Sequence, residues 1–152
     1  MKVRTKNRSA VSPLELAVAA LVAAYCLMGN ALATTYVEPL SVDNLGPFAL
    51  AYHERRPPLV LLPLLLFLLL MCPALPSAGR AALVAFVGAA YANIGSAALW
   101  PSGVPDYIVF SHVDVIANVS DVVMLCSATV VVASILVRLS RRSRSGSVDA
   151  AG

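Results

Sequence analysis

Two aspartates, Asp106 and Asp121, have the type and setting of residues that carry chemistry. Asp106 follows Gly-Val-Pro, a turn signal, and Asp121 opens a strongly apolar stretch. Like charges a few ångströms apart cannot both ionise easily, so a neighbouring pair of carboxylates holds one proton. The ionised member can take a proton from a water that attacks a peptide carbonyl, while the protonated member donates to the substrate. Two neighbouring carboxylates can therefore carry out aspartic-peptidase chemistry, although the spacing of Asp106 and Asp121 alone does not establish it.

Each aspartate also has a structural interpretation. A carboxylate at the start of a helix, as at Asp121, gains from the helix dipole and caps free backbone amides. Taken alone, Asp106 is an ordinary loop acid before the strand-like run Tyr107–Phe110. The pair is more informative, because both acids lie between the third and fourth apolar stretches at one membrane surface. Ionisable groups at such depths are costly, which makes each a candidate functional residue.

Two neighbouring polar residues offer alternatives. Asp114 competes with Asp106 for a place in the pair. His112 lies two positions before Asp114 and suggests a metal ligand, but no third and fourth ligands occur at a recognisable spacing. The sequence therefore predicts no metal and no other cofactor.

The elements that must position these acids are membrane-spanning helices. The chain is 59% hydrophobic and 12% charged, whereas a soluble domain carries about 25% charged residues. A bilayer-crossing helix needs about 20 residues, and open backbone cannot face lipid. Four apolar stretches are long enough, at about 14–33, 59–75, 81–99 and 122–139, so we expect an all-α polytopic membrane protein with four transmembrane helices. Small residues in the third stretch predict close packing on a neighbouring helix: Gly88, Ala89, Ala90, Ala92 and Gly95.

Basic residues indicate the orientation of these helices. The net charge of +3 arises from lysines and arginines before the first helix and after the fourth, and Arg80 lies in the turn before the third. Only Arg55 and Arg56 lie elsewhere, in the first loop. Because Lys and Arg favour the cytoplasmic side, both termini are predicted to be cytoplasmic, and the loops at about 34–58 and 100–120 face outward. Tyr107 then suits an aromatic belt at the outer interface. Glu15, near the inner end of the first helix, is expected to be a solvated or headgroup-level acid.

The chain divides into two parts. Residues 1–139 are predicted to form a single four-helix transmembrane domain, and the Ser/Arg-rich residues 140–152 a disordered basic cytoplasmic tail. The basic ends lack interleaved aromatic residues, so membrane lipids, and not nucleic acid, are the expected partners. A cleaved signal sequence is the alternative for the first helix. It is disfavoured because Tyr25 is large where a small residue is expected and the apolar run continues past Cys26.

Two segments resemble the paired motifs of the lipoprotein signal peptidase (signal peptidase II) family. They are Val104-Pro-Asp106-Tyr-Ile and Asn118-Val-Ser-Asp121, and Asn44-Leu-Gly46-Pro-Phe48 is similar to a third stretch of that family. The resemblance implies that Asp106 and Asp121 form a catalytic dyad. It also implies substrate-binding or supporting roles for four residues: Asn44, Gly46, Asn93 and Asn118.

The same resemblance implies a location and a substrate. It places four helices in the bacterial cell (inner) membrane, with both termini cytoplasmic and the active site at the outer face. The outer loop between helices one and two, near 37–52, would form a small strand-containing platform. The substrates would be lipid-modified prolipoproteins, whose signal peptides the enzyme cleaves.

The sequence departs from the family pattern in several places. The first helix lacks the family's Asp and Lys pair, and the motif around Asn93 has lost its Asp and Arg. The interval between Asp106 and Asp121 is somewhat short. Two functions therefore remain open: an intramembrane aspartic endopeptidase, or a non-catalytic four-helix membrane scaffold or accessory protein that shares the fold.

Overall fold

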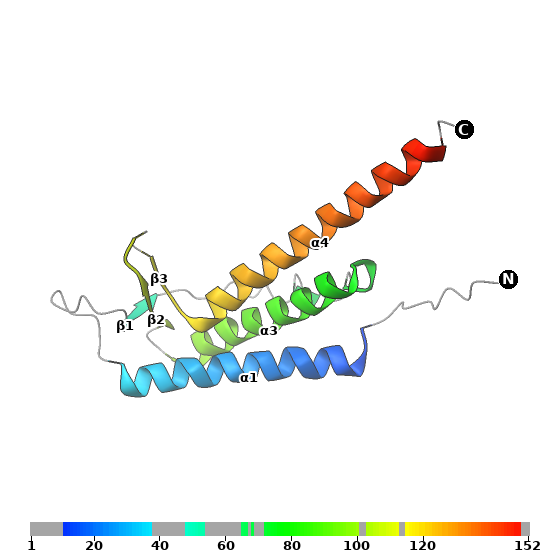
Figure 1. Ribbon diagram of the computed structural model, residues 1–152. Coiled ribbons are helices and arrows are strands. Elements are labelled where there is room, and N and C mark those ends of the chain that lie inside the picture. The colour runs from blue at the N-terminus through cyan, green and yellow to red at the C-terminus, as the bar shows by residue number, and fades with distance from the viewer. Residues whose placement is uncertain are drawn as a thin grey trace.

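The computed structural model describes residues 11–37, 48–53, 65–66, 68, 72–100, 103–112 and 115–149. Its long helices are α1 (Pro13–Tyr36), α3 (Ser77–Leu99) and α4 (Val119–Asp149). A short 3₁₀ helix, η1 (Cys72–Ala74), precedes α3. A small sheet contains β1 (Phe48–His53), β2 (Val104–Phe110) and β3 (Val115–Ala117), as Figure 1 shows.

Helices α1, α3 and α4 each have the length and apolar content to cross a bilayer. The described part of the chain is therefore mostly helical and compatible with a multi-pass membrane protein. The predicted span at 59–75 lies mostly outside the described residues, and Asn44, Gly46 and Asp114 lie wholly outside them.

Local sequence explains where the first two long helices begin and end. Ser12 caps α1 by accepting the Glu15 backbone N–H, the Glu15 side chain accepts the Ser12 backbone N–H, and Pro13 occupies the first helical position. At the end of α3, Trp100 is extended, with φ of −107° and ψ of 115°. Trp100 precedes Pro101, and a residue before proline avoids helical backbone.

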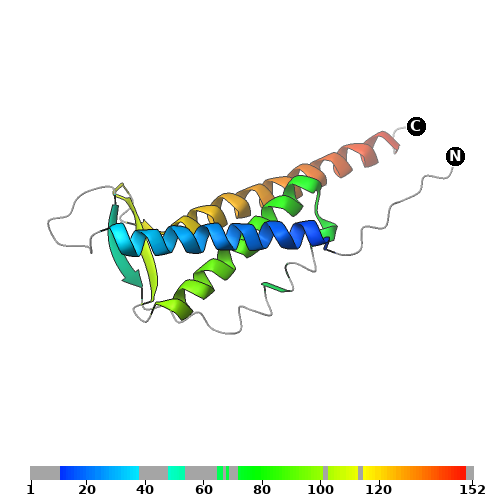
Figure 2. The same ribbon diagram turned by 90° about the horizontal axis from the view of Figure 1, so that it is seen from below.

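Contacts between the first two long helices show that they run parallel. Near their first turns, Glu15 of α1 contacts Arg80 of α3. Near their last turns, Asn30 of α1 contacts Ser96 of α3. The two helices therefore begin at one end of the bundle and finish at the other, as Figures 1 and 2 show.

Helix α4 runs antiparallel to α3. A Cβ on Gly79, at the start of α3, would lie 3.1 Å from the Cβ of Ser134 in the second half of α4. Asn93, near the end of α3, contacts Asp121 in the first turn of α4. Figure 1 shows the sheet at the end where α1 and α3 finish and α4 begins, whereas α1 starts and α4 finishes at the opposite end.

The sheet joins segments from both predicted outer loops. Its order is β1-β2-β3, and both pairs are antiparallel, with Phe48 opposite Ile108 and Ile108 opposite Ala117. The strand β1 lies in the loop after α1, where the sequence predicts strand content. The other two strands come from the loop between α3 and α4, so the platform is shared between the loops and is not built from the first alone.

Small residues allow α1 and α3 to approach closely, as their sequence predicts. Ala89 and Ala92 are fully buried. A Cβ added to Gly88 would collide with the backbone carbonyl of Ala19, and one added to Gly95 would lie 3.3 Å from a methyl group of Leu27. The collision at Gly88 involves backbone, which cannot swing aside, so glycine is required at this crossing.

The last long helix extends beyond the predicted transmembrane domain. The sequence predicts a disordered tail from residue 140, whereas the structure continues α4 as helix to Asp149. Each residue added to an existing helix gains a hydrogen bond without a new nucleation cost, which favours this extension.

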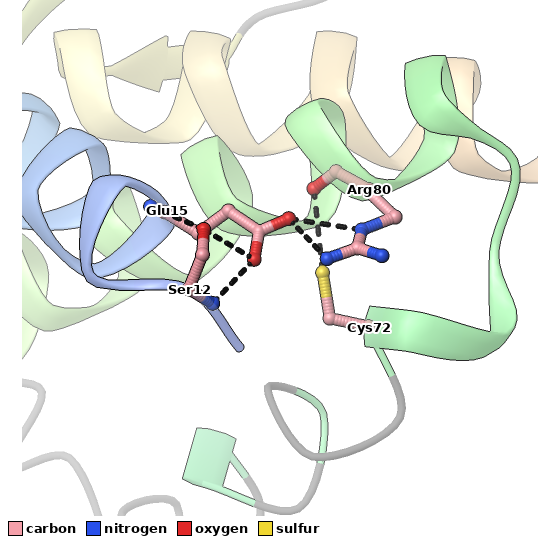
Figure 3. A network of polar contacts seen from close by, with 4 residues as sticks. All are labelled: Ser12, Glu15, Cys72 and Arg80. Atoms are coloured by element: carbon pink, nitrogen blue, oxygen red, sulfur yellow. Dashed lines mark hydrogen bonds and ion pairs between the residues drawn. The ribbon is translucent and has the colours of Figure 1, made fainter. Parts of the chain in front are cut away.

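Glu15 and Arg80 join α1 to α3 at the end of the bundle away from the sheet (Figure 3). Arg80 donates from Nε and Nη2 to Glu15 Oε1 at 2.9 and 2.6 Å. Glu15 Oε2 accepts from the backbone and hydroxyl of Ser12, and the Cys72 thiol donates to the Arg80 carbonyl. This partner of Glu15 was not predicted from the sequence. The parallel packing of α1 and α3 brings Arg80 to the acid.

Replacing one member of this ion pair should destabilise the protein strongly. Glu15→Gln keeps an amide oxygen for the capping box, so it removes mainly the charge. Because the side chains are only 20% and 11% exposed, Glu15→Gln and Arg80→Gln each leave a poorly solvated unpaired charge. We expect each to lower the free energy of unfolding by roughly 2–3 kcal/mol, somewhat below the loss for a fully buried pair.

The double variant provides the control. Glu15→Gln/Arg80→Gln leaves no unpaired charge, so its loss should be clearly smaller than the sum of the two single losses. Chemical unfolding of the purified protein in detergent micelles measures all three variants. Strictly additive losses would show that the two charges do not stabilise each other.

Candidate functional site

Asn118 lies at the junction of the sheet and α4, where it caps the helix. Its side-chain Oδ1 accepts the backbone N–H of Ser120 at 2.8 Å and that of Asp121 at 3.2 Å. In return, its own backbone N–H donates to Asp121 Oδ2 at 3.2 Å. This reciprocal arrangement is a capping box, formed here by an asparagine and an aspartate. It orients the Asp121 carboxylate at the helix N-terminus.

The same asparagine also binds the other predicted dyad residue. Its side-chain Nδ2 donates to Asp106 Oδ1 at 2.7 Å, and both residues are buried. Asp106 lies on β2, opposite Ala51 of β1. The sheet therefore carries Asp106 to the first turn of α4, and Asn118 holds Asp106 through its side chain and Asp121 through its backbone.

Asp121 has a further partner from α3. Asn93 Nδ2 donates to Asp121 Oδ1 at 2.8 Å, so each carboxylate oxygen of Asp121 accepts one of these two hydrogen bonds. Asp121 is half-buried. A helix N-terminus favours negative charge, and the two donors add to that effect.

Four of the predicted site residues are thus brought together by β2, α3 and the start of α4: Asp106, Asp121, Asn93 and Asn118. The other two, Asn44 and Gly46, lie outside the described residues, as does the competing Asp114. His112 is exposed in the turn after β2. Among the described residues, no group of three or more His, Cys, Asp or Glu side chains could hold a metal ion.

A second polar cluster supports the site from α1. Asn30 is fully buried, and its Nδ2 donates to the Ser96 hydroxyl of α3 at 2.7 Å. The hydroxyl of Tyr107 donates to Asn30 Oδ1 at 3.3 Å and accepts the backbone N–H of Val119 at 3.4 Å. This cluster connects α1 and α3 to the strand that carries Asp106.

The position of Tyr107 differs from the sequence prediction. An interfacial belt would leave its ring exposed, but only 9% of the residue is accessible. Burial raises the pKa of Tyr107 above its ordinary value, so the hydroxyl stays protonated and keeps its donor role. The sequence signal for this cluster was Asn30, an amide within an apolar helix, because such a group needs an internal partner.

Two buried polar atoms at the site have no hydrogen-bond partner among the described residues. They are the side-chain Oδ1 of Asn93 and the hydroxyl of Ser120. Both belong to residues that adjoin the acids, since Asn93 binds Asp121 and Ser120 precedes it in the chain. Buried polar atoms usually bind protein, water or ligand, so these two are the groups best placed to bind one.

No protein-family model, curated protein or solved structure matches this chain. The assignment of chemistry therefore rests on the residues and their geometry.

Removing the Tyr107 hydroxyl should loosen the support under the site. Tyr107→Phe leaves Asn30 Oδ1 and the first amide of α4 without this partner, and a buried unsatisfied group costs about 1–3 kcal/mol. The free energy of unfolding in detergent should fall by that amount. Tyr91→Phe on α3 is the matched control, because the Tyr91 hydroxyl makes no hydrogen bond in the described part of the chain. Equal losses in both variants would contradict a role for the cluster.

Proposed function

We propose that this protein is an intramembrane aspartic endopeptidase that cleaves the signal peptides of lipid-modified prolipoproteins. The observation that carries the proposal is the binding of both acids by one buried residue. Asn118 donates to Asp106 through its side chain and to Asp121 through its backbone. An aspartic peptidase needs two carboxyl groups near each other in different surroundings. The partner that Asp106 and Asp121 share, Asn118, supports such an arrangement.

The surroundings suggest a role for each acid. Asp121 lies in the first turn of α4 and accepts two hydrogen bonds, which suits the ionised member that takes a proton from water. Asp106 is buried within the sheet region, which suits the member that carries the shared proton. In this mechanism Asp106 protonates the substrate carbonyl oxygen as water attacks the carbonyl carbon. As the tetrahedral diol collapses and the C–N bond breaks, Asp121 gives the proton that it took from water to the leaving amine, and Asp106 recovers a proton from a diol hydroxyl.

The direction of the helices supports a four-span topology. Because α1 and α3 run parallel, the chain that connects the end of α1 to the start of α3 has to return across the bundle. The apolar stretch at 59–75 has the composition for that crossing. With the positive-inside rule, the proposed topology has both termini in the cytoplasm and the two acids at the outer face of the bacterial cell membrane. A signal peptide anchored in that membrane could then reach them from the bilayer.

Reporter fusions test this topology. A reporter inserted at Asp43 or Asp114 should read as external, and one fused after Gly152 should read as cytoplasmic. The physical reason is the clustering of Lys and Arg at the ends of the chain and at Arg80. An internal readout at either loop position would contradict the four-span model.

The catalytic assignment predicts a distinct pattern among variants. Asp106→Asn and Asp121→Asn should each abolish cleavage of a diacylglyceryl-modified prolipoprotein by the purified protein, because an amide cannot take up or share the proton. Asn118→Ala should leave measurable activity, since a lost supporting hydrogen bond costs roughly 10²–10³ in rate while a lost catalytic group costs several orders of magnitude more. Asp114→Asn is the internal control and should be nearly silent.

The variant Asp121→Asn distinguishes a catalytic role of Asp121 from its role in capping α4. In Asp121→Asn the side-chain oxygen can still accept the Asn118 N–H, and the Asn93 amide can turn to present its oxygen to the new NH2 group. The capping box should therefore remain, and the unfolding free energy should fall by no more than about 1 kcal/mol through the lost charge at the helix N-terminus. Loss of cleavage without a larger loss of stability supports the dyad. If Asp114→Asn abolishes activity and Asp106→Asn does not, the dyad is misassigned. If the wild-type protein cleaves no lipid-modified precursor, the residues serve as a cap and the protein is a non-catalytic scaffold.

A further inference from the structure

A groove of about 910 Å³ opens at the end of the bundle away from the two acids. It lies between η1, the start of α3 and the second half of α4. Its walls are mainly apolar, with one wall from the chain around η1 and the other from α4: Pro73, Leu75, Ala78, Val130, Ala133 and Val137. The groove is separate from the candidate site, which lies at the opposite end of α4.

Two arginines complete the lining of the groove. Arg138 donates from Nη1 to the Ala74 carbonyl oxygen and so bridges α4 to η1. Arg141 lies one turn further along α4 and is exposed. Neither arginine forms an ion pair with any described residue, whereas Arg80 at the same end is paired with Glu15. The groove therefore combines an apolar wall with two cations that have no protein counter-ion in the described chain.

The dimensions of the groove match half of a bilayer. Its α4 residues recur at intervals of three and four, so they form one stripe along the helix. The rise from Val130 to Arg138 is about 12 Å, at 1.5 Å per residue. One leaflet contributes roughly 15 Å of hydrocarbon, so the apolar stripe faces the acyl region and the guanidinium groups reach the headgroup level.

We infer that this groove binds one anionic diacyl glycerophospholipid from the adjacent leaflet. The lipid phosphate lies against Arg138 and Arg141, and an acyl chain lies along Val130, Ala133 and Val137. Two cations without protein counter-ions, placed at the mouth of an apolar groove one leaflet deep, match an amphiphile with an anionic head. A zwitterionic lipid lacks the net negative charge. The inference does not depend on peptidase activity, since it concerns other residues at the other end of the bundle.

Lipid binding to the full-length protein tests the inference directly. The purified protein in a non-ionic detergent is titrated with dioleoyl phosphatidylglycerol or dioleoyl phosphatidylcholine and examined by native mass spectrometry. Each basic side chain near the headgroups contributes roughly fivefold in affinity, so we expect about a 30-fold preference for the anionic lipid and one tightly held molecule. Equal retention of the two lipids would overturn the inference.

Charge variants test the headgroup contact. Arg138→Gln/Arg141→Gln should lose most of the preference for phosphatidylglycerol, while Arg138→Lys/Arg141→Lys should keep much of it because the positive charges remain. If the glutamine variant keeps the full preference, the arginines are not the headgroup site and the inference fails.

A matched pair of apolar variants tests the groove itself. Ala133→Phe fills the groove and should displace the lipid, whereas Val132→Phe adds a ring on an exposed residue that does not line it and should leave binding unchanged. Unchanged binding in Ala133→Phe would show that lipid is attracted to surface charge alone. An equal loss of lipid binding in both phenylalanine variants would show that binding depends on helix packing in general. Either result overturns the proposed groove site.

Discussion

The capping of α4 by Asn118 is the interaction on which the arrangement at the sheet end of the bundle depends. A helix that starts at the membrane surface exposes backbone N–H groups, and these need acceptors where water is scarce. Asn118 satisfies two of them with one side-chain oxygen, and its side-chain Nδ2 donates to Asp106 on the sheet. The start of the helix, the strand β2 and the acid on that strand are therefore held in one geometry by a single buried amide. Replacing it would disturb capping and the acid together.

The bundle is held by polar contacts at both ends of an apolar crossing. The ion pair between Glu15 and Arg80 joins α1 and α3 at one end, and Asn30 with Ser96 joins them at the other. Between these contacts, Gly88 lets the two backbones touch. In lipid, apolar side chains gain little by packing against one another, so close approach and hydrogen bonds decide the register of helices. Placing polar contacts at the two ends fixes both the direction and the register of this pair.

How well the sequence predicts a feature of this structure depends on how far apart in the sequence the interacting residues lie. The spans around α1, α3 and α4, the strand-like run before Phe110 and the close packing at Gly88 are local patterns, so the sequence predicts them. The role of Glu15 was missed because its partner Arg80 is distant in sequence, and no periodicity within α1 reveals it. Tyr107 was placed in the interface for the same reason, since its burial depends on Asn30 from another helix.

The candidate site also combines contacts that a local sequence pattern predicts with contacts that depend on tertiary packing. The proximity of Asn118 to Asp121 follows from their spacing of three at a helix start, which is a local capping pattern. The contact between Asn118 and Asp106 depends on how β2 meets α4, which no spacing rule predicts. The contact between Asn93 and Asp121 depends on the antiparallel register of α3 and α4. Residue types thus indicated the chemistry, while tertiary packing determined how the groups are combined.

The order of the paired strands along the chain affects when the sheet can form during synthesis. Strand β1 follows α1, but its partner β2 follows α3, so β1 has no strand to pair with until α3 has been made and inserted. Such long-range strand pairing forms late, because a large part of the chain must be ordered first. The paired surface that carries Asp106 therefore forms only after α1 and α3 have been made. A nascent chain that ends within α3 already contains β1 but lacks both acids.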